Sequence, residues 1–374
     1  MRRLAVPIEL FFVFLRDFTI FFAIYLIVSL SLNLEHGYAG IPNFGKVLAV
    51  AGGAFVAGFF PGRLVALISN IGTEQYNGFW DYTSTAYHTT IVDEINKILT
   101  GNPAFSIAIL LLSILVAALV GAGLGYVASF PAIKLREDYL AIILLAMGES
   151  IRVIGHNFQP IVGGQWGVFI PDVFGWAGDL RYLAVLFFIG GICILVFIFQ
   201  ERLVRSPLGR MLRATRDNEN VAEALGKNVT SIRMKVIMVA AMIGAVAGAL
   251  DAFKTGGVTA SMYHRETWTF WPWVMVVLGG AGNNIGVVAG VFVFTLLRRG
   301  IDFFKGSLDP FVPFSVVWLE PLLMGVMLIL ILMYRPEGII PEKPISTLEE
   351  SKLEKIKKSL KRIFRSSRNS EVDT

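Results

Sequence analysis

Six apolar runs, each about as long as a membrane-spanning helix, constrain this chain more than any other feature. They cover residues 18–34, 104–127, 139–154, 182–199, 236–250 and 316–334. A helix needs about 20 largely apolar residues to cross the hydrocarbon core of a bilayer. The runs are apolar on all sides, unlike the alternating strands of a membrane β-barrel. Only 16% of the 374 residues are charged, against about 25% in soluble domains. The sequence therefore predicts an all-α polytopic membrane protein.

Lysine and arginine are unevenly distributed among the connecting segments. Segment 201–235 carries eight of them, whereas segment 69–103 carries one and segment 156–179 none. Cytoplasmic loops are enriched in these residues. We therefore predict a membrane domain over residues 1–338, with 201–235 as a cytoplasmic loop and 69–103 as an external insert. Arg2 and Arg3 predict a cytoplasmic N-terminus, and Lys134 and Arg136 a cytoplasmic link before residue 139.

The tail from 339 to 374 is rich in lysine and arginine and is also predicted to be cytoplasmic. Apolar residues occur near helical spacing among the lysines of segment 348–364. This pattern predicts a basic amphipathic helix that lies on the anionic lipids of the inner leaflet. The basic charge of the chain is therefore attributed to membrane lipids and not to nucleic acid.

Two glycine-rich regions, 37–68 and 270–297, lie between segments assigned to the same side. Each region must then cross the membrane an even number of times. Small residues interrupt each of them, at Gly52 and Gly53 in the first region and at 279–284 in the second. We predict two glycine-broken or re-entrant hairpins, 8 to 10 helical membrane segments in all, and two similarly oriented repeats. Unwound backbone at membrane depth is typical of a translocation path. Close helix packing by small residues is the alternative.

The predicted path residues are glycines of these regions and the polar residues beside them. They are Asn33, Gly37, Gly40, Asn43, Gly45, Glu149, Gly279, Gly280, Gly282, Asn283, Asn284 and Gly286. The asparagines could equally cap broken helices. Glu149 is a costly residue within an apolar run and is therefore a functional candidate, but it could also form a structural ion pair with Arg152.

Segment 206–228 is the only long polar stretch between apolar runs. A short amphipathic surface helix is predicted by the Pro-Leu-Gly start at 207–209, by Arg213, Arg216 and Asn220 at steps of three and four, and by Gly226 as a stop. A soluble partner is expected to dock there, and a solvated loop is the alternative. The residues assigned to this contact are Arg210, Arg213, Arg216, Asp217, Asn218, Glu219, Ala222, Glu223 and Gly226.

Catalytic and cofactor signals are weak in this sequence. Segment 40–47 approaches the phosphate-loop pattern, but Val47 supplies no hydroxyl for magnesium and an apolar helix precedes it. The four histidines have no metal-ligand spacing, and Cys193 is the single cysteine. We therefore expect no catalytic residues, no metal site and no bound cofactor in this chain.

Several motifs together resemble one family, the permease subunits of branched-chain amino-acid ABC importers, of the LivM type in the LivH/LivM permease family. They are Leu32-Asn-Leu-Glu-His-Gly-Tyr-Ala-Gly40, Leu135-Arg-Glu-Asp-Tyr-Leu-Ala-Ile142, Gly148-Glu149, Gly163-Gly164 with Gly167, the 206–228 segment, and Val276-Val-Leu-Gly-Gly-Ala-Gly282 with Gly286 and Gly290. The resemblance spans about residues 32–338. The chain departs from the family at Ile41 and at Asn43-Phe-Gly-Lys46, where Gln and Ser-Leu-Gly-His are usual.

The resemblance implies a transport subunit of a prokaryotic plasma membrane, not an enzyme. It implies a second, LivH-like permease, two cytoplasmic ATPases that use ATP and Mg, and an extracytoplasmic solute-binding protein. It also implies that segment 206–228 is the coupling helix seated on an ATPase. The expected function is import of branched-chain amino acids, or of urea, amides or another small polar solute. A stand-alone secondary transporter or channel is the alternative.

Overall fold

The computed structural model describes residues 8–73, 75–135, 137–308, 315 and 318–342. The chain divides into two units, Met1–Pro341 and Glu342–Thr374. The predicted tail helix 348–364 and the residues Arg2, Arg3 and Arg136 lie outside the described part of the chain.

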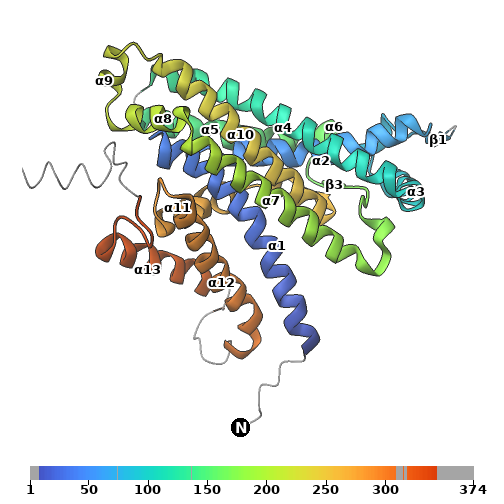
Figure 1. Cartoon of the computed structure of the whole chain (residues 1–374). Coiled ribbons are helices and arrows are strands. Elements are labelled where there is room, and N and C mark those ends of the chain that lie inside the picture. The colour runs from blue at the N-terminus through green and yellow to red at the C-terminus, as the bar shows by residue number, and fades with distance from the viewer. Residues whose placement is uncertain (1–7, 74, 136, 309–314, 316–317, 343–374) are drawn as a thin grey trace, which may run out of the picture. The chain divides into compact units, whose positions relative to one another are not determined.

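Long helices dominate the first unit (Figure 1). The α-helices are α1 (Ile8–Asn33), α2 (Lys46–Ile68), α3 (His88–Gly101), α4 (Pro103–Lys134), α5 (Glu137–Asn157), α6 (Gln159–Val162), α7 (Arg181–Arg205), α8 (Pro207–Asp217), α9 (Glu219–Ala224), α10 (Val229–Thr255), α11 (Trp271–Gly279), α12 (Asn284–Leu308) and α13 (Leu319–Tyr334). Shorter π- or 3-10-helical turns are η1 (Leu34–Tyr38), η2 (Asp81–Thr83), η3 (Gly175–Leu180), η4 (Ala260–Met262) and η5 (Glu266–Phe270).

Two small antiparallel ladders lie within the described residues. Strand β1 (Gly72–Thr73) pairs with β2 (Tyr76–Asn77), and β3 (Val168–Phe169) pairs with β4 (Gly257–Val258). The second ladder joins the segment before α7 to the end of α10, with Val168 opposite Val258.

The prediction of an all-α polytopic membrane protein is confirmed. Within the described residues, six helices are long and apolar enough to cross a membrane, and five of them contain predicted runs: α1, α4, α5, α7 and α10. The sixth run, 316–334, contributes α13, which has 16 residues. The sixth long helix is α2, which lies in the region predicted to form a glycine-broken or re-entrant hairpin.

Helix α2 runs without a break through Gly52 and Gly53, so the predicted hairpin over 37–68 is wrong. A Cβ added at Gly53 would lie 1.8 Å from the carbonyl oxygen of Ala245, and one at Gly248 would lie 1.9 Å from that of Val50. These glycines let the backbones of α2 and α10 approach closely, which is the alternative that was left open. The core of the membrane domain lies at this crossing.

The second predicted break is confirmed. Helices α11 and α12 meet at residues 280–283 with a bend of 118°. Gly280 has a φ of 110°, in the region that favours glycine. The last carbonyls of α11 accept hydrogen bonds from the segment after α13. The N–H groups of Ile339 and Ile340 donate to the carbonyls of Leu278 and Gly279 at 2.9 and 3.0 Å.

Helices α1 and α7 run in the same direction. Near their beginnings the Arg16 guanidinium lies 4.2 Å from the centre of the Tyr182 ring, and near their ends Gln200 donates to the carbonyl of Leu30 at 2.7 Å. Because α7 leads into segment 206–228, the start of α1 lies at the opposite end from that segment. The prediction that both lie on one side of the membrane is therefore wrong.

The direction of α1 also contradicts the prediction of two similarly oriented repeats. The end of α1 packs against the first half of α10, where the Ser31 hydroxyl donates to the carbonyl of Ala240 at 3.0 Å. Helix α10 starts beside segment 206–228, whereas α1 ends there. The two helices that would begin each repeat thus run in opposite directions.

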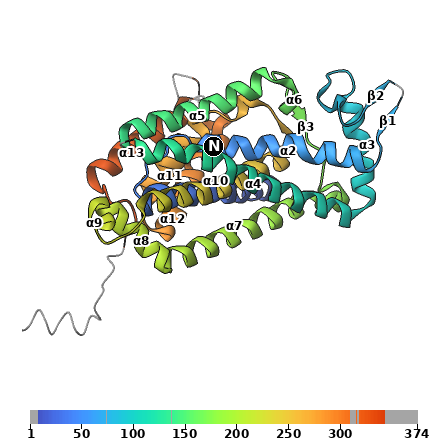
Figure 2. The ribbon, with the colours of Figure 1, turned by 90° about the horizontal axis from the view of Figure 1, so that it is seen from above.

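The 69–103 insert and the segment before α7 lie together at the end of the helices opposite α8 and α9 (Figures 1 and 2). Two insert side chains hold the backbone of Phe169: the Tyr82 hydroxyl donates to its carbonyl at 3.0 Å, and its N–H donates to Nε2 of His88 at 2.7 Å. The Nδ1 of His88 therefore carries the ring proton and donates it to the carbonyl of Tyr82. The insert is fixed to β3 through these bonds.

This arrangement predicts that acid loosens the insert. Burial of the imidazole, helped by the nearby Arg63 charge, holds the pKa of His88 below its ordinary value of 6.5. The folded ring stays neutral while the unfolded one takes up a proton, so the stability contributed by His88 is present above pH 6.5 and falls as the pH drops below it. Limited proteolysis of the insert should accelerate between pH 8 and pH 5, roughly the range in which a histidine titrates. The His88→Gln variant should lose that pH dependence; equal acceleration in both proteins would contradict the assignment.

Candidate functional site

Segment 206–228 folds as two short helices at the end of α7. A Cβ at Gly209 would lie 1.9 Å from the carbonyl oxygen of Val204, so only glycine permits the tight turn from α7 into α8. Leu212 and Thr215 are buried beneath α8. The side chain of Asn218 caps α9 by accepting from the N–H of Val221 at 3.1 Å. The prediction of a surface helix in this segment is confirmed, with a second helix added.

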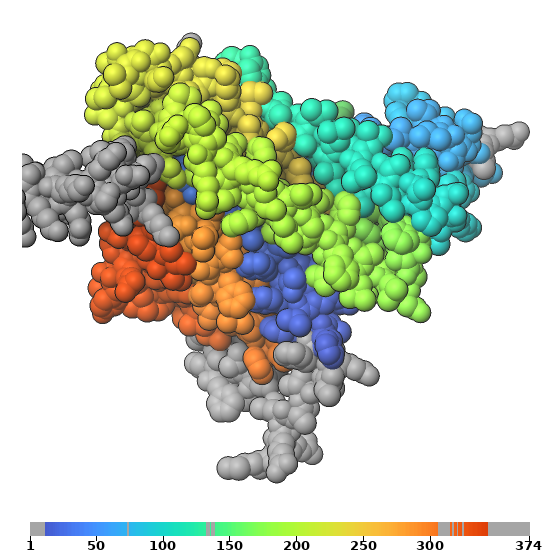
Figure 3. Space-filling model, viewed as in Figure 1, coloured from blue at the N-terminus to red at the C-terminus, as the bar shows by residue number. Residues whose placement is uncertain are grey.

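The outward side of this segment carries an apolar tip. Val221 is 54% exposed and Leu225 is 74% exposed, and Arg210 and Glu223 are exposed nearby, whereas Ala222 is buried. Helix α9 is tied to α10 by an ion pair of 2.8 Å between Glu219 and Arg233. Gly226 ends the segment in a left-handed conformation, with a φ of 76°. In the space-filling view these helices form a prominent end of the surface (Figure 3).

The inward side of α8 contacts η1 and the loop that follows it. The guanidinium of Arg213 lies 5.1 Å from the centre of the Tyr38 ring, and Arg216 donates to the carbonyl of Gly37. A Cβ at Gly40 would lie 2.8 Å from Cγ of Arg216. Arg216 therefore lies against two of the predicted path glycines and Arg213 against Tyr38 between them, and not on the outward side with Val221 and Leu225.

A fully buried ion pair joins η1 to the first residue of α2. The ammonium of Lys46 lies 3.0 Å from a carboxylate oxygen of Glu35, and both side chains are 0% exposed. Asn43 donates to the other carboxylate oxygen of Glu35 at 3.0 Å and accepts from the N–H of Gly45 at 2.8 Å. Lys46 also donates to the carbonyl of Ala240 in α10 at 3.2 Å. We call Glu35, Asn43 and Lys46 the Glu35 cluster.

The same loop also contacts η5 and α11. The indole N–H of Trp273 donates to the carbonyl of Asn43 at 2.9 Å, and the rings of Phe44 and Trp273 stack with their centres 4.6 Å apart. The hydroxyl of Thr269 accepts from the N–H of Val47 at 3.1 Å. The loop between η1 and α2 thus joins α8, α10 and α11.

The two predicted glycine regions meet at Asn33. Its side-chain oxygen accepts from the N–H of Gly282 at 2.9 Å, and its amide donates to Asn284 at 3.0 Å. Asn284 also accepts from Gln200 at 3.2 Å and donates to Glu201 at 2.9 Å. A Cβ at Gly37 would lie 2.4 Å from the N–H nitrogen of Gly282. This junction is closely packed, with Asn33 and Asn284 buried.

The other predicted path residues make separate contacts. Gly279 and Gly286 pack α11 against α12, where a Cβ at Gly279 would lie 2.2 Å from the carbonyl oxygen of Gly286. Asn283 donates to the carbonyl of Pro341 at 3.1 Å. Gly45 packs against α5, where an added Cβ would lie 2.0 Å from the carbonyl oxygen of Leu144. Glu149 forms the expected ion pair with Arg152 on α5 and is not among the residues of the junction.

The chain matches, over residues 14–332, the family model described as branched-chain amino acid transport system / permease component. It belongs to this permease family. The probable branched-chain amino acid transport permease protein LivM of Methanocaldococcus jannaschii is 41% identical over 331 residues, which cover 88% of this chain and 93% of that relative.

More distant relatives include permeases that are named for other solutes. The high-affinity branched-chain amino acid transport system permease protein LivM of Escherichia coli is 28% identical over 252 residues, which cover 60% of this permease and 56% of that protein. The galactose/methyl galactoside import permease protein MglC of Haemophilus influenzae is 21% identical over 310 residues, 77% and 87% of the two chains. No solved structure matches the permease.

Glu35 and Lys46, the central residues of the permease's buried cluster, were not among the predicted site residues. Both charges stand between long apolar stretches, which is a signal of function or of a buried partner. Gln200, whose amide joins α7 to the junction at Asn33, was not predicted either. That residue stands at the end of an apolar run, where a polar side chain is unremarkable.

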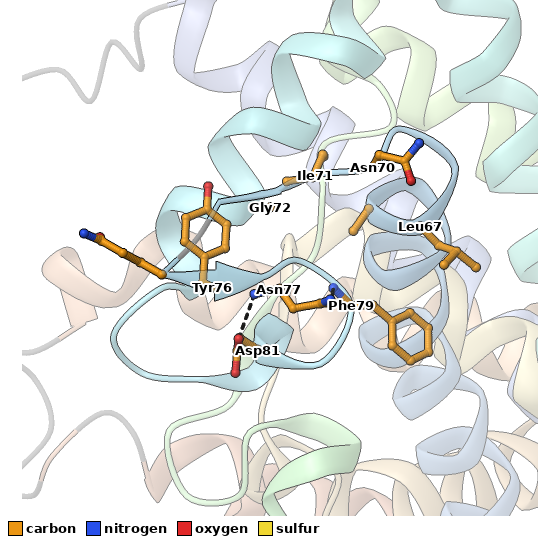
Figure 4. Close-up of a pocket in the computed structure, with 10 residues that line it drawn as sticks. Leu67, Asn70, Ile71, Gly72, Tyr76, Asn77, Phe79 and Asp81 are labelled. Carbon is orange, nitrogen blue, oxygen red and sulfur yellow. Dashed lines mark hydrogen bonds between the residues drawn. The ribbon is translucent and has the colours of Figure 1, made fainter.

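A separate cavity of about 520 Å³ lies at the 69–103 insert of the permease. Figure 4 shows Tyr76, Asn77 and Asp81 on one side of it and Leu67 and Asn70 on the other. None of the predicted path residues lines it. In the described part of the chain no group of histidine, cysteine, aspartate or glutamate side chains could hold a metal ion.

Proposed function

We propose that this permease is the membrane subunit of an ATP-driven importer of branched-chain amino acids. Its partners in this proposal are a second permease, two cytoplasmic ATPases that use ATP and Mg, and an extracytoplasmic solute-binding protein. Membership of the family supports transport, and the named solute of the relatives at 41% and 28% identity supports the substrate.

The proposed orientation follows from the charge of segment 201–235. Placing its eight lysines and arginines in the cytoplasm satisfies the usual bias of cytoplasmic loops. Since α1 and α7 are parallel, the start of α1 and the 69–103 insert then lie outside, and the segment after α13 lies inside. This orientation differs from the cytoplasmic N-terminus expected from Arg2 and Arg3.

One observation carries the proposal: α8 and α9 expose an apolar tip on one side and hold η1 on the other. Val221 and Leu225 provide the surface for an ATPase, and Arg213 and Arg216 convert movement of α8 into movement of the loop before α2. Nucleotide-driven closure of the ATPases then shifts this loop between two arrangements, and the solute passes between the two permeases by alternating access.

Placing a charge on the exposed tip should separate docking from folding. Leu225→Asp puts a carboxylate into the proposed apolar contact while leaving the buried side of α8 intact. We expect it to lower ATPase co-purification and substrate uptake at least about tenfold, as for a residue at the centre of an interface. Removing the charges of Arg213, Arg216 and Glu219 would be less informative, because all three bind the permease itself.

The control is Leu180→Asp, an exposed leucine just before the opposite end of α7, with 62% exposure against 74% for Leu225. It should leave ATPase binding unchanged. Wild-type uptake by Leu225→Asp, or uptake by the purified permease alone in vesicles driven by an ion gradient, would refute the proposal and favour a stand-alone secondary transporter.

A further inference from the structure

The Glu35 cluster has no part in the docking contact described above, yet it occupies the space between that contact and the core. An ion pair with both side chains fully buried is costly to desolvate and contributes little net stability compared with apolar packing of the same volume. Glu35 lies within the candidate span 12–38 and Lys46 begins the candidate span 46–68, and ionisable residues in such segments usually mark function.

Hydrogen bonds and one ion pair form a continuous series across the fold. Arg216 of α8 binds the carbonyl of Gly37 in η1, and Glu35 lies in the same turn. Glu35 binds Lys46, the first residue of α2, which in turn binds the carbonyl of Ala240 in the middle of α10. Asn43 binds Glu35 and fixes the loop between them. Ser31 of α1 donates to the same carbonyl of Ala240.

From this series we infer that Glu35, Asn43 and Lys46 are positioning residues that transmit the displacement of α8 to α2 and α10. The inference rests on the proposed function, and it adds the route by which the coupling contact reaches the two most deeply buried spanning helices. The ammonium of Lys46 bridges two elements, the carboxylate of η1 and the backbone of α10. A shift of η1 therefore either carries the start of α2 with it or breaks a buried ion pair, which is strongly unfavourable.

The test uses the complete importer in lipid vesicles, with uptake and ATP hydrolysis measured together. Glu35→Gln and Lys46→Met each leave one buried charge without its partner, and both should reduce the yield of assembled complex. The double variant Glu35→Gln/Lys46→Met removes both charges and should assemble with its ATPases at the wild-type level. We expect it to retain ATP hydrolysis but to transport about tenfold less solute per ATP, within the usual range of coupling effects.

A purely structural pair would behave differently, because the double variant would then recover both assembly and transport per ATP. That result would overturn the inference. If the double variant fails to assemble, Asn43→Ala tests the same link with both charges in place. It should lower transport per ATP about fivefold, and an unchanged ratio would equally overturn the inference.

The matched control is Arg299→Gln/Asp302→Asn, which removes the ion pair of 3.7 Å near the far end of α12. It should leave transport per ATP unchanged, and a loss equal to that of the cluster variant would overturn the inference. Failure of the proposed function gives a separate result, since the wild-type permease would then not co-purify with an ATPase at all.

Discussion

Replacing Gly53 by alanine is expected to unfold the permease at the crossing of α2 and α10. The added methyl group would lie 1.8 Å from the carbonyl oxygen of Ala245, which belongs to helix backbone and cannot move alone. Separating the two helices costs about 3 kcal/mol, at the upper end for overpacking a core. Gly248→Ala, on the facing helix, should behave in the same way because its methyl group would meet the carbonyl of Val50. Thermal unfolding in detergent, followed by size-exclusion chromatography, measures the loss.

Gly123 of α4 supplies the matched control. It is also a glycine within a spanning helix, but a Cβ added there has no neighbour within 4 Å. Gly123→Ala should keep or slightly raise the unfolding temperature, since alanine is the better helix former by about 1 kcal/mol. Equal unfolding temperatures for Gly53→Ala and Gly123→Ala would show that α2 and α10 do not pack as described.

Replacing Asn33 by alanine is expected to abolish most transport. The change removes the acceptor of the Gly282 N–H and the donor to Asn284, in the buried junction between α1 and the break before α12. An unsatisfied buried N–H costs about 1 to 3 kcal/mol. The break should then shift away from η1, and both thermal stability and uptake should fall.

Asn157→Ala controls for the loss of an amide. Asn157 is exposed and donates to the carbonyl of Val153 in its own helix at 2.8 Å. This variant should unfold and transport like the wild type. Retention of full uptake and stability by Asn33→Ala would rule out a role for the junction in transport.

The membrane helices could be predicted from the sequence, whereas their directions could not. Apolar runs report burial in lipid directly, and five of the six runs lie in long helices. The direction of α1 was inferred from Arg2 and Arg3, two charges at a chain end set against eight in segment 201–235. The wrong direction of α1 then required region 37–68 to cross the membrane an even number of times, and therefore to form a hairpin. Gly52 and Gly53 made the hairpin plausible, because glycine serves both to break helices and to pack them.

The residues of the candidate site were predicted better than their contacts. A helical pattern shows which residues of segment 206–228 share a side, but not what lies against each side. Arg213 and Arg216 therefore looked like a surface for a partner, although they contact Tyr38 and Gly37. Likewise, the distance in sequence between Asn33 and Asn284 gives no sign that their amides meet.

The broken end of α11 has a consequence for the biogenesis of this permease. The donors for its last carbonyls, the N–H groups of Ile339 and Ile340, are synthesised after every helix described here. Leu278 and Gly279 are buried, and buried backbone groups without partners are costly, so the nascent chain must hold an unfinished helix until translation reaches these residues. A product that stops at Tyr334 would contain all of these helices and still display an open defect, which a quality-control protease could recognise.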